Sequence, residues 1–416
     1  MTPVPSCNII LEPDLPSWLQ QIKMENAIRK ETDKEVCKIL NIKIVNASKA
    51  GENYSSLLLR IKTDVELADG KHKTLSFVLK AQHPNQFMIQ ITNMLRLFPK
   101  EEEMYYRILP RFEKLYEDVG KIVQFAPKVH RFDHDIGVEH ILMEDLQVNR
   151  YKNVNRVEGL DMIHSQAVLR KLAEYHAASA CYVEKYGQFS EDFTQGVFSS
   201  KNRGLQQEFN ASSAFLAQLK KWPSCQKYYE KLCDTDVYLV DRLLEDQKVN
   251  AREFNVLNHG DLWCNNIMFQ YDAFGKIKNT LFVDFAISKY GSPANDLYYF
   301  ILSSCAADIK LSEFDYMIRY YYDHLIENLK LLQYARPLPK LVNIHSSLLR
   351  NGLAAYMVVS KVLPAVILQN TDNANLENYM EDQSKMKMSM FSNPKYVQAM
   401  MEILPWLDNR GLLDWI

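Results

Sequence analysis

The chain has 416 residues, of which 47% are hydrophobic and 24% are charged, and its formal net charge is −2. This balance is typical of a folded globular protein rather than a disordered or fibrous one. The near-neutral charge and the lack of a Lys- and Arg-rich run interleaved with aromatic residues argue against nucleic-acid binding. The length is enough for two domains of ordinary size or one large bilobed unit.

The start of the sequence and its cysteines indicate a cytoplasmic protein. Residues 1–19 contain four prolines and no basic region followed by an apolar core, so we expect no signal peptide. No apolar run is long enough to span a bilayer. The seven cysteines are dispersed and form no CxxC pair, which predicts reduced thiols rather than disulfides or a zinc site. We expect no membrane association, and no obligate protein partner is evident.

The first third of the chain predicts antiparallel strands bordered by helices. We expect a helical extension over residues 1–40 and a β-rich unit over residues 41–146. In this unit, residues 42–47 are a short β-branched run, and residues 55–67 alternate between apolar and polar. Asp69-Gly70 is a hairpin signal, and the alternation over residues 75–80 predicts a third strand. These strands would form a meander.

The rest of the chain predicts mainly helices. Residues 98–115 predict a helix with a kink or break at Pro110, and residues 138–146 predict another strand. Helical periodicity begins near Ser165 and continues to the end, except for a small strand-rich insert over residues 256–287. We therefore expect residues 147–416 to form a larger helical part. A β-rich part followed by a helical part is an α+β arrangement that many unrelated proteins share.

The strongest chemical signal is the string His259-Gly-Asp-Leu-Trp-Cys-Asn-Asn266, followed by Leu281-Phe-Val-Asp-Phe285. Phosphoryl transfer needs one carboxylate that orients the attacking hydroxyl and accepts its proton. It also needs a carboxamide and a second carboxylate that hold Mg²⁺ against the phosphates. Asp261 can fill the first role, and Asn266 and Asp284 the other two. A hairpin that runs from Asn266 to Asp284 would place both residues beside one metal ion.

The motifs formed by these residues resemble those of known phosphotransferases. The HGDxxxxN element and the Val-Asp-Phe strand resemble the phosphotransferases that include aminoglycoside and choline kinases. The fuller string, which continues through Gly291 to Asp296-Leu-Tyr-Tyr-Phe300, is more similar to the ecdysteroid kinase-like family, an arthropod branch of that group. The resemblance runs from about residue 40 to about residue 310. It implies a protein-kinase-like bilobed fold with a small β-rich N-lobe, a larger helical C-lobe, and ATP and Mg²⁺ bound between them.

The resemblance also implies which residues meet the nucleotide. Lys80 would hold the α and β phosphates, and Glu101 would be its ion-pair partner. Glu101, Glu102 and Glu103 are adjacent on a helix and so point in different directions; Glu101 is chosen for its position after Phe98. A covering loop would approach the phosphates, and a hinge would meet the adenine with backbone groups. The loop positions are Gly51, Asn53, Ser55 and Ser56, and the hinge positions are Glu144 and Leu146.

The resemblance implies ATP- and Mg²⁺-dependent phosphorylation of a hydroxyl on a small lipophilic molecule, either ecdysteroid-like or xenobiotic. One alternative is a choline- or ethanolamine-type kinase, which would need an aromatic and acidic cage for its cation. Another is a non-catalytic pseudokinase that binds a lipophilic ligand, although the intact set of Lys80, Asp261, Asn266 and Asp284 argues against it. Ala286 follows Asp-Phe where the family usually has Gln, which changes contacts beside the site but removes no metal ligand.

Overall fold

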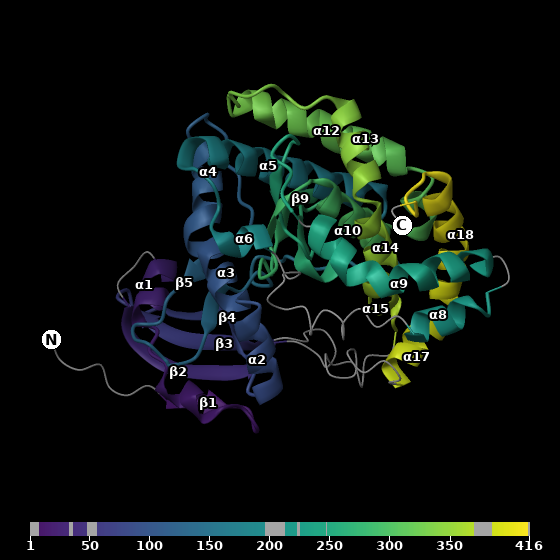
Figure 1. Ribbon diagram of the computed structural model, residues 1–416. Helices are drawn as coiled ribbons and strands as arrows, with labels where there is room; N and C mark the ends of the chain where they lie inside the picture. Colours follow the sequence, from purple (N-terminus) through teal and green to yellow (C-terminus); the bar gives the residue numbers. More distant parts are fainter. Residues whose placement is uncertain are drawn as a thin grey trace.

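The computed structural model describes residues 8–32, 36–47, 56–195, 213–222, 225–246, 248–369 and 385–414. Figure 1 shows a β-rich part at one end of the molecule and a larger, mostly helical part that extends to α8, α17 and α18 at the other. The predicted α+β class, with a smaller β-rich N-terminal lobe and a larger helical C-terminal lobe, is confirmed.

The N-terminal lobe is built on one six-stranded sheet with the strand order β1-β2-β3-β4-β6-β5. The three long strands β2, β3 and β4 pair antiparallel, as predicted, and the hairpin between β3 and β4 turns at Gly70, whose φ is 77°. The short strands at both edges were not predicted. The strands are β1 Asn8–Leu11, β2 Val36–Asn46, β3 Ser56–Leu67, β4 His72–Gln82, β5 Val129–His130 and β6 His140–Glu144.

The prediction of a helical extension over residues 1–40 is wrong in part. A 3₁₀ turn, Ser17–Gln21, and helix α1, Glu25–Thr32, do lie there. However, β1 pairs in parallel with β2, with Ile9 opposite Ile42, and β2 already begins at Val36. A four-residue strand carries too little alternation to be recognised from sequence, because it depends on the backbone groups of the edge that it joins.

The helix expected over residues 98–115 is present as three consecutive segments. They are α3, Leu97–Glu103, a π-helical turn, Met104–Ile108, and α4, Leu109–Glu117. Pro110 lies in the first turn of α4. Proline lacks an N–H and its ring clashes with the carbonyl four residues earlier, and the wider π turn before α4 accommodates this. Helix α2, Gln86–Met94, was not predicted.

The C-terminal lobe contains most of the helices and two small sheets. Its long helices α5 and α12 pack against each other, and the two-stranded sheets β7–β10 and β8–β9 lie at the side that faces the N-terminal lobe. The strands are β7 Val256–Asn258, β8 Ile267–Tyr271, β9 Ile277–Phe282 and β10 Lys289–Gly291. The helices are α5 Met162–Tyr186, α6 Glu191–Gln195, α8 Ser213–Leu219, α9 Lys227–Asp246, α10 Ala294–Ser304, α11 Ala307–Lys310, α12 Phe314–Leu331, α13 Leu341–Arg350, α14 Gly352–Met357, α15 Leu363–Ile367, α17 Lys385–Ser392 and α18 Pro394–Asn409.

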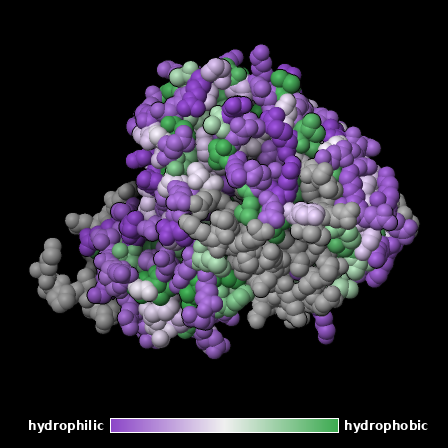
Figure 2. All heavy atoms as spheres, in the orientation of Figure 1, coloured by the Kyte–Doolittle hydropathy of each residue, from purple (hydrophilic) through white to green (hydrophobic). Residues whose placement is uncertain are grey.

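Each lobe has its own hydrophobic core. The N-terminal core lies between one face of the sheet and α1, and it includes Ile28, Ile61 and Phe77. The larger core fills the C-terminal lobe and continues onto α4 and β6. Helix α4 is therefore anchored to both lobes. Among the residues coloured in Figure 2, polar ones predominate and hydrophobic ones are scattered. Within the described ranges, no helix combines the length and apolar character that a bilayer crossing requires.

Candidate active site

The loop between β7 and β8 carries the string identified in the sequence, and Gly260 allows its sharp turn. The φ angle of Gly260 is +85°, and a Cβ atom at this position would lie 2.4 Å from the carbonyl oxygen of Ile287. The carboxylate of Asp296, in the first turn of α10, accepts the backbone N–H groups of His259 at 2.7 Å and Gly260 at 2.9 Å. The loop is therefore fixed by glycine at its tightest point and by a buried carboxylate beside it.

Two buried histidines contact this loop or the residues that support it. His259 Nε2 lies 3.0 Å from the carbonyl oxygen of Val283, so the imidazole links the loop to the residue before Asp284. His176, on α5, contacts Asp296 at 3.2 Å and the Tyr321 hydroxyl at 2.7 Å. Burial lowers the pKa of both histidines below its ordinary value, although Asp296 opposes the shift. Both imidazoles have structural partners rather than open coordination positions.

Both carboxylate oxygens of Asp261 accept a hydrogen bond. The amide of Asn266 donates to Oδ2 at 2.8 Å, and the hydroxyl of Tyr299 donates to Oδ1. Burial raises the pKa of Asp261 to about 6, and the nearby charge of Asp284 adds to the rise, while the bonds from Tyr299 and Asn266 oppose it. A carboxylate with such a pKa is ionised at neutral pH and can still accept a proton readily.

Asn266 and Asp284 lie together at one end of the β8–β9 hairpin. Ile267 pairs with Phe282, and the N–H of Val283 donates to the carbonyl oxygen of Asn266 at 3.0 Å. The φ angle of Asp284 is +66°, a left-handed conformation that is uncommon for residues other than glycine and that recurs at functional sites. The sequence predicted this hairpin and the juxtaposition of its two ends.

Lys80, on β4, connects the two lobes through its side-chain ammonium. The Nζ atom lies 2.7 Å from Glu101 Oε2, on α3, and 2.8 Å from Asp284 Oδ1. Burial alone would lower the pKa of Lys80, but the charges of Asp284 and Glu101 outweigh it, so this pKa is raised. For Asp284, burial acts to raise the pKa, but the charge and hydrogen bond of Lys80, together with His259 and the backbone N–H of Ala286, outweigh burial, so this pKa is lowered. Burial raises the pKa of Glu101 to about 7, against the opposing charge of Lys80.

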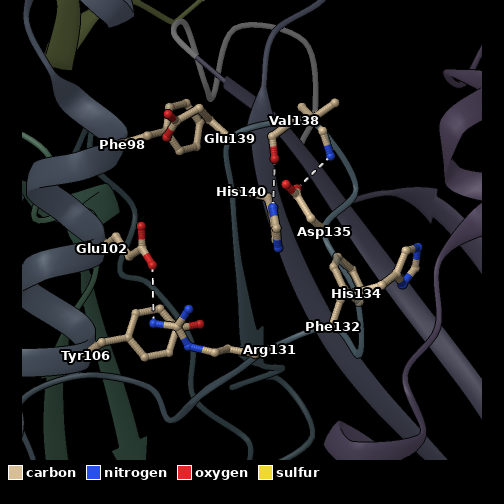
Figure 3. Close-up of a pocket in the computed structure, with 11 residues that line it drawn as sticks. Phe98, Glu102, Tyr106, Arg131, Phe132, His134, Asp135, Val138, Glu139 and His140 are labelled. Atoms are coloured by element: carbon tan, nitrogen blue, oxygen red, sulfur yellow. Dashed lines mark hydrogen bonds and ion pairs between the residues drawn. The ribbon is translucent and has the colours of Figure 1, made fainter.

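The three consecutive glutamates of α3 have different partners. Only Glu101 reaches Lys80. Glu102 points into a hollow of about 590 Å³ on the outer side of α3, where it lies 3.3 Å from Arg131. Figure 3 shows this pair, with the Arg131 guanidinium stacked over the ring of Tyr106 at 4.0 Å from its centroid. Glu103 pairs with Arg107, one helical turn further along. Helical geometry thus separates the three side chains as the sequence indicated.

A cleft of about 450 Å³ lies between the lobes, and Asn265 and Val283, the neighbours of Asn266 and Asp284 in the chain, line it. Glu144 and Leu146, the predicted hinge residues, both line it. The Glu144 carboxylate accepts the N–H of Lys128 at 2.9 Å, so this side chain stabilises the connection to β5. Leu146 is buried. The lining combines charged and polar residues, such as Arg60, Asp145 and Arg156, with apolar ones from both lobes. The apolar residues are Ala47, Leu58, Val78, Pro127, Met143, Leu146, Val154, Met268 and Val283.

The predicted covering loop lies largely outside the described residues. Gly51, Asn53 and Ser55 belong to that part of the chain. Ser56, the fourth predicted position, is buried at the start of β3, where it pairs with Gln82 on β4. The loop therefore stays a prediction.

Several residues of the cleft and of the neighbouring site were not identified from the sequence. Arg60, on β3, forms a 2.7 Å ion pair with buried Asp145, directly after β6. The side-chain amide of Asn153 donates to the carbonyl oxygens of Asn265 and Ile267, both at 2.9 Å, and so supports the loop that carries Asn266. Tyr299 lies three residues after Asp296 on α10. This spacing places the two side chains on one face of the helix, and it is the feature of the sequence that could have predicted Tyr299 near the site.

The charges in the cleft suit a divalent cation. The carboxylates of Glu101 and Asp284 both contact the ammonium of Lys80, and the carboxylate of Asp261 lies close enough to Asp284 for the two charges to interact. Asn266 uses its amide nitrogen to bind Asp261, which leaves its amide oxygen for a metal. Hard cations such as Mg²⁺ prefer oxygen ligands of this kind and retain several waters. The described part of the chain has no group of three or more His, Cys, Asp or Glu residues that could hold a metal ion alone.

The chain combines a two-lobed fold with a cluster of polar side chains between the lobes. A family model identifies the class of protein to which it belongs. The family model "Ecdysteroid kinase-like family" matches residues 50–334, more than half of the chain. The chain belongs to this family. No curated protein matches it.

Among the solved structures, the chain is similar to amicoumacin kinase hAmiN in complex with AMP-PNP, Ca²⁺ and Ami. The identity is 14%, the TM-score is 0.39, and the match covers 85% of this chain and 91% of the other. At this TM-score the two structures differ too much for a residue-by-residue comparison.

Proposed function

We propose that this protein is an ATP- and Mg²⁺-dependent phosphotransferase that acts on a hydroxyl group of a small lipophilic molecule. The observation that carries the proposal is the contact of Lys80 with Asp284 and of Asn266 with Asp261, beside a cleft that the neighbouring residues Asn265 and Val283 line. Phosphoryl transfer depends on positioning and on electrostatic stabilisation, and these four side-chain types are those that it uses.

In this proposal the apolar side chains of the cleft receive the adenine. Val78 and Met143 line it from the N-terminal lobe, and Met268 and Val283 line it from the C-terminal lobe. The hinge residues Glu144 and Leu146, which line the cleft, would meet the base edge with backbone groups. Lys80 holds phosphate oxygens, and Glu101 fixes the direction of the lysine side chain, as their 2.7 Å contact supports.

Asn266 and Asp284 would hold the metal ion, which supplies positive charge against the β and γ phosphates when it is bound. Asp261 would accept the proton of the acceptor hydroxyl. The acceptor oxygen forms a bond to the γ phosphorus, the bond from that phosphorus to the departing ADP oxygen breaks, and the hydroxyl proton moves to the carboxylate. A base with a pKa near 6 is suited to this transfer at neutral pH.

The acceptor class is proposed from the family that the chain belongs to. We propose a hydroxylated lipophilic acceptor, such as an ecdysteroid or a xenobiotic, and membership of the arthropod branch of the family. A choline-type acceptor would need an aromatic and acidic cage next to Asp261.

Isothermal titration calorimetry tests the nucleotide part of this proposal. We expect binding of the non-hydrolysable analogue AMP-PNP to the full chain in the presence of Mg²⁺. The affinity should fall at least tenfold when the metal is omitted. No binding under either condition would contradict the proposal and favour a non-catalytic ligand-binding protein.

A further inference from the structure

Helix α10 supports the loop of the proposed base at two points. Asp296, in its first turn, accepts the backbone N–H groups of His259 and Gly260. Tyr299, three residues later and thus on the same side of the helix, donates its hydroxyl to Oδ1 of Asp261. One rigid element therefore fixes both the backbone of the loop and the direction of its carboxylate.

The two oxygens of Asp261 are bound by groups of different kinds. Oδ2 accepts from Asn266, which belongs to the same loop, and Oδ1 accepts from Tyr299, which belongs to a separate helix. A carboxylate oxygen has two lone pairs, so Oδ2 can accept a second donor without losing the first. The tyrosine hydroxyl also prevents rotation of the carboxylate about its Cβ–Cγ bond.

We propose that Tyr299 is a positioning residue for the proposed base: its hydroxyl holds Oδ1 of Asp261 so that Oδ2 faces the acceptor hydroxyl. This inference rests on the proposed function. As the acceptor oxygen bonds to the γ phosphorus and ADP departs, the acceptor proton moves to Oδ2. Tyr299 keeps its own proton and remains a donor to Oδ1 throughout. The new carboxylic acid then releases the proton to water.

The neighbouring tyrosine provides a matched control. Tyr298 is buried, and its hydroxyl donates to the carbonyl oxygen of Leu348 at 2.9 Å, away from the proposed base. Tyr298→Phe and Tyr299→Phe each remove one hydroxyl from adjacent positions of the same helix and keep the ring. Thermal melting of both variants shows whether they fold.

The test compares kcat and the KM for ATP of phosphate transfer in the wild type and both variants. For Tyr299→Phe we expect kcat to fall about tenfold to a hundredfold with the KM for ATP unchanged. Tyr298→Phe should keep the wild-type kcat and KM. A folded Tyr299→Phe variant with the wild-type kcat would overturn this inference and leave the proposed function intact. A wild-type protein that transfers no phosphate to any acceptor would overturn both.

Discussion

The ammonium of Lys80 lies 2.8 Å from Asp284 Oδ1, and this contact joins two residues that are 204 positions apart in the chain. The ion pair spans the cleft from the N-terminal sheet to the end of the β8–β9 hairpin. Both residues are assigned to the nucleotide and its metal in the proposed function. Their direct contact shows that the two lobes meet at this point.

The different partners of the α3 glutamates predict different effects for neighbouring substitutions. Glu101→Gln removes the charge that faces buried Lys80, so we expect kcat/KM for ATP to fall on the order of tenfold to a hundredfold, the equivalent of about 1.4–3 kcal/mol. Glu102 and Arg131 are 45% and 65% exposed, and such pairs contribute little. Glu102→Gln should change kcat/KM less than twofold. Equal effects of the two substitutions in steady-state kinetics would contradict the pairing.

The raised pKa of Asp261 predicts a defined pH dependence. The carboxylate must be ionised to accept a proton, so activity should be lost as the pH falls through about 6. This is well above the ordinary range of an aspartate. We expect kcat/KM to show an acidic limb with a midpoint near pH 6. A midpoint near pH 4 would show that Asp261 is not the group that controls the reaction.

The same raised pKa predicts how Asp261→Asn affects stability. Because the folded state holds the proton more tightly than the unfolded state, the ionised side chain lowers the free energy of unfolding at pH values above about 6. Asp261→Asn removes that charge. We expect the variant to be inactive and to melt at pH 7.5 no lower than the wild type. A clearly lower melting temperature would indicate that the side chain is mainly structural.

The proposed metal ligands predict a change in metal affinity. Asp284→Asn keeps the size of the side chain and removes the charge, so we expect the Mg²⁺ concentration at half-maximal activity to rise at least tenfold. Electron paramagnetic resonance of Mn²⁺, with AMP-PNP present, gives a readout that does not depend on turnover. Asp272→Asn is the control, because Asp272 caps the distant turn of the same hairpin. Unchanged Mn²⁺ affinity in Asp284→Asn would contradict the assignment.

Gly260, in the loop between β7 and β8, and Gly275, in the turn of the β8–β9 hairpin, both have left-handed backbones. We expect them to differ in how far they tolerate substitution by alanine. In Gly260→Ala the new Cβ would lie 2.4 Å from a carbonyl oxygen of the backbone, so we expect loss of activity and several degrees of lowered melting temperature. Gly275 has a similar φ of +78° but no heavy atom within 4 Å. Gly275→Ala should therefore cost only the backbone strain, about 1–2 kcal/mol. Chemical denaturation of both variants measures the difference.

The sequence predicted those features that depend on local patterns. Alternation identified β3 and β4, and the Asp69-Gly70 turn set their register. The hairpin of Asn266 and Asp284 followed from two short apolar runs around a turn. Helical spacing separated the three glutamates of α3, although only the structure shows their partners.

The features that the sequence did not reveal depend on contacts between distant segments. β1 needs the edge of β2, and Arg60 meets Asp145 only because β3 and β6 flank β4 in the sheet. The bond of Tyr299 to Asp261 requires the packing of α10 beneath the loop. No local periodicity encodes such contacts, because each partner is compatible with many environments on its own.

The most direct test of the central claim is phosphate transfer from isotopically heavy ATP. The full chain would be incubated with Mg²⁺, ATP labelled with ¹⁸O in the γ phosphate, and a pool of ecdysteroids, plant phenolics and choline, with Asp261→Asn as the control. Mass spectrometry should find a heavy phosphate ester of a lipophilic alcohol that is absent in the control. A labelled product from choline alone would correct the acceptor class. A protein that forms no labelled product and binds no nucleotide would contradict the account.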